Sequence, residues 1–319
     1  MKPLQIAFFL IISAFLLGCS ISIPDPNQIN PLVEKNLSGE GDDKILIIEI
    51  TGVISQKNKI KNISGKYDIN SVAEIKEKLM LAEEDPAIKA VILLVDSPGG
   101  EVTATDIIYH EIKSFKERRN IPVIADISSV GASGAYYIAM ASDRIVARPT
   151  SIVGSIGVII SSVNLTPLME KIGVESVTYK SGAHKDMGSP MKPPSKDDDE
   201  LFNSIIRQLH SQFVTIVTQN RKLDPARIDQ ITDGRVFSAQ QALENHLIDQ
   251  IGYFKDTVAL AKRVANIKSE SVIIYHRDGE FIENVYHVSD TSVMFQMMGL
   301  NLERLFTNDT PKFLYLWRP

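Results

Sequence analysis

The chain is poor in cysteine, in basic charge and in long apolar runs, and each shortage excludes a class of protein. Its 319 residues include one cysteine, which excludes an internal disulfide framework and a cysteine-based metal site. Lys and Arg number 34 against 39 Asp and Glu, and this balance argues against a nucleic-acid partner, which usually needs a basic face. Apolar residues make up 44%, an ordinary globular proportion that permits a substantial core.

Only the N-terminus has the pattern of a membrane-targeting segment. Lys2 precedes an apolar run over residues 4–18, which is short for a spanning helix of about 20 residues but typical of a signal peptide. The single cysteine, Cys19, follows Leu-Leu-Gly and resembles the lipidated cysteine of a bacterial lipoprotein. We therefore expect a signal peptide at 1–18, lipidation of Cys19, a polar tether over 19–43, and a location in the cell envelope, on the inner or outer membrane or the outer surface. A plain secretory signal or an uncleaved anchor is the alternative.

From residue 44 onwards, short apolar runs alternate with amphipathic stretches. We expect strands at 45–50, 90–95, 122–127, 144–147 and 177–179, and helices at 71–84, 103–117, 135–141 and about 197–220. Ser71 and Glu74 indicate a capping box on the first of these helices. Repeated β-α-β units predict an α/β fold with a mainly parallel sheet.

Two glycine-rich turns, 96–100 and 128–134, follow predicted strands at their carboxyl ends, where α/β sheets place their sites. Ser133 is the leading candidate nucleophile, because the N-terminus of the helix that follows it supplies free N–H groups. The Gly134 amide is one candidate donor to an oxyanion, and Gly99 or Gly100 is a candidate second donor. The alternative is that Ser133 merely caps its helix.

A serine nucleophile needs a general base, and one loop offers Lys180, His184 and Lys185. A lysine base must be uncharged, which requires that burial lower the usual lysine pKa of about 10.4. Each of these side chains is also typical of a solvated loop, so the local sequence leaves the choice open. His110-Glu111 lacks the second histidine of a zinc protease.

Five blocks of sequence, in this order along the chain, resemble the signal peptide peptidase A family. They are residues 91–100, 131–138, 154–158, 180–186 and 233–236. The family consists of membrane-associated serine proteases of the S49 class, with a fold like that of the Clp protease and crotonase groups. The resemblance covers roughly residues 45–265. It implies that Ser133 is the nucleophile, Lys185 the general base, and Gly100 and Gly134 the oxyanion donors. Lys180 remains the fallback base.

The resemblance also implies how the protein is organised and what it acts on. We expect a peptidase domain over 44–267, a C-terminal extension over 268–319, and a homo-oligomer in which neighbouring subunits share active sites. The implied substrates are peptides or unfolded proteins, such as signal-peptide remnants, and no metal or organic cofactor is implied. Ala135 departs from the family, which often has glycine there. The alternatives are a crotonase-like acyl-CoA enzyme, against which the export signal argues, and a catalytically silent scaffold that binds membrane proteins.

Overall fold

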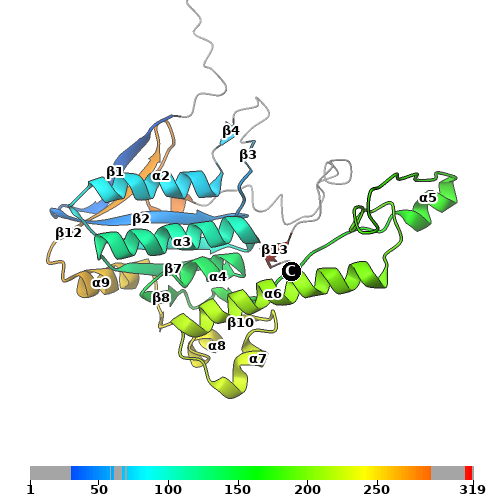
Figure 1. Ribbon diagram of the computed structural model, residues 1–319. Coiled ribbons are helices and arrows are strands. Elements are labelled where there is room, and N and C mark those ends of the chain that lie inside the picture. Colours follow the sequence, from blue (N-terminus) through cyan, green and yellow to red (C-terminus); the bar gives the residue numbers. More distant parts are fainter. Residues whose placement is uncertain (1–29, 58, 61–66, 69, 289–312, 318–319) are drawn as a thin grey trace, which may run out of the picture.

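The computed structural model describes residues 30–57, 59–60, 67–68, 70–288 and 313–317, and Figure 1 shows its central sheet with helices packed around it. Seven strands follow the order β1-β12-β2-β5-β7-β8-β11, while β9 pairs with β7 and β10 pairs with β9. The neighbours β12, β2, β5, β7, β8 and β11 run parallel, and β1 is antiparallel to β12. The expected α/β class with a mainly parallel sheet is therefore confirmed. The strands of this sheet are β1 Leu32–Gly39, β2 Asp43–Thr51, β5 Ile88–Ser97, β7 Val123–Ala132, β8 Arg144–Ala147, β9 Ile152–Gly154, β10 Val236–Ser238, β11 Gln250–Ile251 and β12 Glu270–Arg277.

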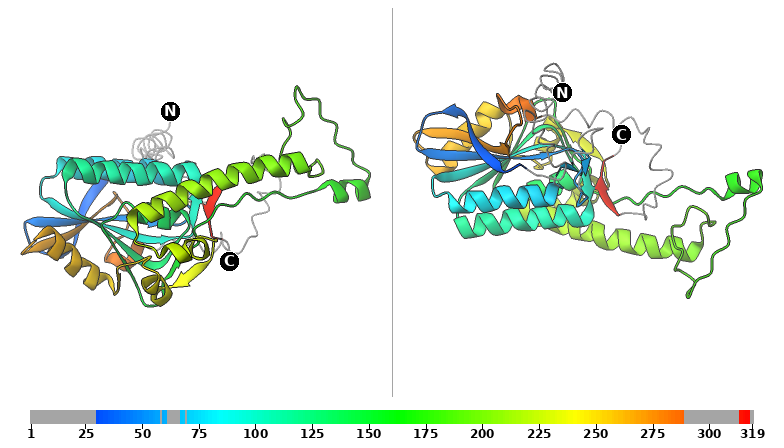
Figure 2. Two further views of the ribbon diagram at one scale, coloured as in Figure 1. Left: turned by 60° about the horizontal axis from the view of Figure 1, so that its bottom comes forward. Right: turned by 90° about the horizontal axis from the view of Figure 1, so that it is seen from above.

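The middle strands form the core because helices cover both of their faces. Residues 90–95 of β5 form a continuous apolar run, the pattern of a strand buried on both sides. One face packs against α2 Ser71–Glu84, α3 Val102–Arg119 and α4 Gly134–Ala139, and the other packs against α9 Phe254–Ala265 (Figure 2). The apolar cluster on the side of α2, α3 and α4 includes Val95 and Ile127, close to the carboxyl ends of β5 and β7.

Smaller elements complete the described part of the chain. The strand pair β6–β13 carries the candidate site, and a second pair, β3–β4, is separate from the main sheet. The bounds are β3 Lys59–Ile60, β4 Tyr67–Asp68, β6 Gly99–Glu101, α7 Ile228–Ile231, α8 Ala239–Glu244 and β13 Leu314–Leu316, with 3-10 turns at Pro225–Arg227 and Val285–Val288.

An arm projects from this body (Figures 1 and 2). It comprises residues 159–195, including α5 Thr166–Ile172, and leads into the long helix α6 Lys196–Asn220. Phe213 and Val217 on the C-terminal half of α6 are fully buried against the body, whereas most of the arm is exposed. Among the residues that the structure describes, no helix is both long and apolar enough to cross a membrane.

The structure differs from several sequence-based expectations. Residues 32–39, placed in the tether, form β1, which pairs antiparallel with the edge of β12. The segment placed in the C-terminal extension contributes β12 to the main sheet. Asn70, not Ser71, caps α2, because its side chain accepts a hydrogen bond from the Ala73 amide. The stretch 177–179 is exposed and forms no strand. The predicted signal peptide and Cys19 lie outside the described residues.

Candidate active site

Ser133 lies at the turn between β7 and α4, as its sequence context predicts. Its φ and ψ are 54° and −118°, a conformation that only glycine adopts readily and that costs a serine about 1–3 kcal/mol. The turn is held by hydrogen bonds from the Ser133 amide to the Gly154 carbonyl at 2.7 Å and from the Tyr137 amide to the Ser133 carbonyl at 3.0 Å. The side chain of Ser133 makes no capping hydrogen bond to α4, so capping does not explain the serine.

Gly100 and Gly134 come from different strand ends, and the fold brings their amides together. A methyl group built on Gly134 would lie 3.2 Å from the Gly100 nitrogen, and one built on Gly99 would lie 2.6 Å from the Gly134 nitrogen. Gly99 has a φ of +97°, and its carbonyl accepts a hydrogen bond from Ile54 at 2.9 Å. The backbone nitrogens of Gly134 and Gly100 therefore lie close together at the turn that follows Ser133, as a predicted pair of oxyanion donors requires.

The backbone of Ile54 explains why glycine is needed in β6. A methyl group on Gly100 would lie 2.0 Å from the Ile54 carbonyl oxygen. The Ile54 amide donates a hydrogen bond to the Gly99 carbonyl, and the Ile54 carbonyl accepts one from the Glu101 amide. Backbone groups of successive residues in a strand point to opposite edges, so the amide of Gly100 points to the other edge of β6. On that edge β6 pairs with β13, and Gly134 lies beside the pair.

The three candidate bases all lie on the arm, remote from the Ser133 turn of the same chain (Figure 1). Lys180 is held in an ion pair with Asp186 at 2.8 Å and also donates to the Ala183 carbonyl. His184 bonds through Nδ1 to Asp198 at 2.9 Å. Lys185 is exposed, and its backbone is held in a turn by a bond from its amide to Gly182. Within one chain, the structure therefore does not bring the predicted Ser133 and Lys185 together.

Two carboxylates fix the arm turn that carries Lys185. Hydrogen bonds from Lys180, and then from Lys192, hold the pKa of Asp186 below its usual range. Hydrogen bonds from His184 and Lys192 hold the pKa of Asp198 well below its usual range. Both groups are ionised at neutral pH, so they tie the turn to the first turn of α6.

Thr105 on α3 is a neighbour of the site that the sequence did not single out. It is fully buried, and its hydroxyl has no hydrogen-bond partner in the described part of the chain. A methyl group on Gly134 would lie 2.6 Å from that hydroxyl, so Thr105 closes the space behind the Gly134 amide. No sequence signal marks it, because it lies among the apolar residues on the buried face of α3.

Comparison with known proteins places this chain in a family. The sequence model of peptidase family S49 matches residues 116–268, and that of Clp protease matches residues 44–153. A protein of Enterococcus faecium that carries the name signal peptide peptidase SppA is 36% identical over 90% of this chain and 85% of its own length. The chain belongs to peptidase family S49.

A further relative and a solved structure are similar to this chain. The chloroplastic serine protease SPPA of Arabidopsis thaliana is 34% identical over 71% of this chain and 33% of its own length. A solved structure of a membrane-bound stomatin-specific protease with a substrate peptide is 17% identical, covers 74% of this chain and 94% of its own, and superposes with a TM-score of 0.44. The family models and the relative from Enterococcus faecium show that the chain is a serine-type peptidase with a Clp-like fold that acts on peptide substrates.

Proposed function

We propose that this S49 peptidase is an envelope-anchored endopeptidase that uses a Ser133–Lys185 dyad. The observation that carries the proposal is the backbone of Ser133, held at φ 54° beside the paired amides of Gly100 and Gly134. A strained serine at a strand-to-helix turn presents its hydroxyl to a substrate carbonyl, while two backbone amides donate hydrogen bonds to the oxygen of that carbonyl.

The reaction then follows the acyl-enzyme route. Uncharged Lys185 removes the proton from the Ser133 hydroxyl as its Oγ bonds to the substrate carbonyl carbon, and the oxyanion lies between the two glycine amides. The peptide C–N bond breaks, and the lysine returns its proton to the leaving amine. Water then attacks the ester with Lys185 again as base, which releases the new carboxyl terminus and restores Ser133.

The position of Lys185 supports a dyad shared between subunits. The arm carries exposed apolar side chains, at Val163, Leu168, Ile172, Val174 and Val177, each more than half exposed. Such a surface is typical of a protein interface. Packing of the arm on a neighbour would cover these side chains, and it would remove Lys185 from water, which favours the uncharged amine. The proposed assembly is therefore a homo-oligomer in which each arm completes the next site.

The proposed substrates are unfolded peptides near the membrane, such as signal-peptide remnants. The S49 relatives that carry the signal peptide peptidase name support this class. The sequence around Cys19 resembles a lipoprotein lipidation site and so supports a lipid anchor. Stable attachment needs more than one acyl chain, and a lipidated lipoprotein cysteine carries them.

The test uses purified full-length chain and a quenched fluorogenic peptide. Ser133→Ala and Lys185→Ala should each lower kcat by at least about 10³-fold with an unchanged circular dichroism spectrum. Lys180→Met should keep most of the activity, because Lys192 also binds Asp186 and keeps the arm turn in place. Wild-type turnover in Ser133→Ala would end the proposal, and loss of activity in Lys180→Met alone would move the base to Lys180.

A further inference from the structure

A β-bulge in β7 lies directly before the Ser133 turn. The register between β5 and β7 shifts there, so that a single residue of β5, Asp96, lies opposite residues 128–130 of β7. Before the bulge β7 pairs with β8, and after it the end of β7 pairs with β9. A bulge bends its strand and re-aims the side chains that follow, and bulges are common beside active sites. This bulge therefore sets the direction in which β7 delivers Ser133.

The carboxylate of Asp96 holds the bulge. A backbone amide in a bulge loses its partner in the strand ladder, and here the Val130 amide donates instead to Asp96 Oδ1 at 3.1 Å. Ser128 adds a second link between the strands, because its hydroxyl donates to the Val95 carbonyl at 3.2 Å. We infer that Asp96 is a positioning residue of the peptidase: through Val130 it fixes the bulge, and so the place of the Ser133 hydroxyl.

The main chain of Asp96 is fixed on the other side, at the end of β2. Its carbonyl accepts a hydrogen bond from the Gly52 amide at 3.1 Å. The hydroxyl of the next residue, Ser97, donates to the Gly52 carbonyl at 2.6 Å and accepts from the Gly99 amide at 3.1 Å. The end of β5 is thereby tied to the start of β6, which carries Gly100.

Asp96 thus links both halves of the candidate site. Its side chain holds the segment that leads to Ser133, and its main chain belongs to the strand end that leads to Gly100. After the bulge, the Ser133 amide donates to the Gly154 carbonyl of β9 at 2.7 Å. Attack on a carbonyl needs the hydroxyl and the oxyanion donors in a fixed relation, and a misplacement of about 1 Å can cost about 10²-fold in rate. Loss of the bond between Asp96 and Val130 should therefore lower kcat more than it raises KM.

Asp96 acts through its oxygen rather than through its charge. The side chain is partly buried, and this burial raises the pKa of its carboxyl, while the Val130 hydrogen bond and the charge of Arg148 oppose the rise. Burial disfavours the charged form, so the position is suited to an acceptor oxygen. An uncharged side chain with the same oxygen, as in Asp96→Asn, should hold the bulge as well.

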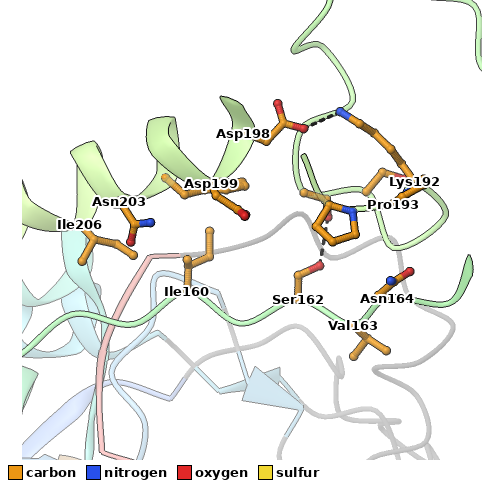
Figure 3. Close-up of a pocket in the computed structure, with 14 residues that line it drawn as sticks. Ile160, Ser162, Val163, Asn164, Lys192, Pro193, Asp198, Asp199, Asn203 and Ile206 are labelled. Atoms are coloured by element: carbon orange, nitrogen blue, oxygen red, sulfur yellow. Dashed lines mark hydrogen bonds and ion pairs between the residues drawn. The ribbon is translucent and has the colours of Figure 1, made fainter. Parts of the chain in front are cut away.

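The contacts around the bulge come, within the described residues, from β2, β5, β7 and β9 and not from the arm. The arm is held by a separate set of bonds, in which Lys192 binds Asp198 beside a cavity of about 410 Å³ between α6 and residues 160–164 (Figure 3). A change at Asp96 should therefore leave the turn that carries Lys185 intact. Limited proteolysis checks this, because the arm should be cut at the wild-type rate in every Asp96 variant.

Turnover of full-length variants on the fluorogenic peptide tests the inference, which rests on the proposed function because it concerns the Ser133 nucleophile. Asp96→Ala should lower kcat about 10- to 100-fold with little change in KM, since the nucleophile loses its alignment. Asp96→Asn should keep most of the wild-type kcat, because its amide oxygen still accepts from Val130.

Asp126 supplies the matched control. It is a buried carboxylate on β7, before the bulge, and it accepts a hydrogen bond from Thr257 of α9 at 2.7 Å. Asp126→Ala should lower the Tm at least as much as Asp96→Ala, because it leaves a buried hydroxyl unpaired, and the folded variant should keep its kcat. Asp126→Asn replaces it if the alanine variant does not fold.

Inhibition by a peptide aldehyde gives a readout that a loss of stability alone would not change. The Ser133 Oγ bonds to the aldehyde carbon, the serine proton passes to the general base, and the new oxyanion lies at the glycine amides. Inhibition should weaken about 10- to 100-fold in Asp96→Ala and stay near the wild-type value in Asp96→Asn and Asp126→Ala. The same peptide with a terminal amide forms no bond to the serine, and it should bind Asp96→Ala and wild type equally.

The outcomes separate this inference from the proposed function. Wild-type kcat in Asp96→Ala, an equal loss of kcat in Asp126→Ala, or no rescue by Asp96→Asn overturns the inference. If Ser133→Ala is inactive in the same assay while Asp96→Ala turns over like wild type, the inference alone fails and the proposed function stands. If Ser133→Ala retains wild-type turnover, the proposed function fails, and this inference fails with it.

Discussion

Gly99→Ala tests the oxyanion geometry most sharply, because one methyl group would enter the space between the two donors. That methyl would lie 2.6 Å from the Gly134 nitrogen, well inside the contact distance of about 3.5 Å for non-bonded atoms. A substrate carbonyl oxygen could then not reach both amides. Loss of one such donor costs about 10²–10³ in kcat, and we expect a decrease of this size.

The control separates this effect from backbone strain. Gly99 has a φ of +97° and Gly234 a φ of +93°, so alanine is strained at both, but nothing lies within 4 Å of a methyl group on Gly234. Gly234→Ala should lose about 1 kcal/mol of stability in thermal unfolding and keep its turnover on the fluorogenic peptide. Gly99→Ala should lose more stability than this, because its methyl group also meets the backbone of Gly134 and Tyr315. Equal turnover in the two folded variants would refute the assignment of the oxyanion site.

Three further predictions concern stability, pH and the anchor. Lys78→Ala should lower the unfolding free energy by about 3–5 kcal/mol in denaturant titration, because it leaves the buried Glu49 carboxylate unpaired, while Lys76→Ala at an exposed pair should cost less than about 1 kcal/mol. The histidine and lysine partners of Asp198 depress its pKa in the folded chain, so its stabilising effect is present above the ordinary carboxyl pKa and is lost as pH falls through the depressed value. Asp198→Asn should therefore make the arm sensitive to limited proteolysis at pH 7. An arm in this variant that is as resistant as in the wild type would contradict the prediction. Cys19→Ser should move the protein from the membrane fraction to the soluble one, and an unchanged fraction would exclude the lipid anchor.

Much of the body could be predicted because periodicity is a local signal. The predicted helix over residues 71–84 has the same bounds as the observed α2, and the buried run at 90–95 lies inside β5. The Ser133 turn was also readable, since a serine between glycines follows a strand and precedes a helix. These features depend on neighbours in sequence, which a single chain displays.

The rest depends on contacts between distant segments. The pairing of residues 32–39 with β12 needs a partner more than 200 positions away, so the polar composition of this segment alone predicts a tether. The approach of Gly100 to Gly134 and the ring contact of Tyr315 with Phe213 also arise only when the chain folds. The fold of a single chain does not place a serine beside Lys185, because the proposed partner serine belongs to another copy.

Mixing two inactive variants tests the central claim most directly. Full-length Ser133→Ala and Lys185→Ala are combined, unfolded and refolded together, and assayed with the fluorogenic peptide. Where a Lys185→Ala chain contributes its serine and a Ser133→Ala neighbour contributes its lysine, an intact shared site forms, so the mixture should recover a clear fraction of wild-type turnover while each variant alone stays inactive. A co-assembled mixture, verified by pull-down of differently tagged chains, that remains inactive would contradict the shared Ser133–Lys185 dyad.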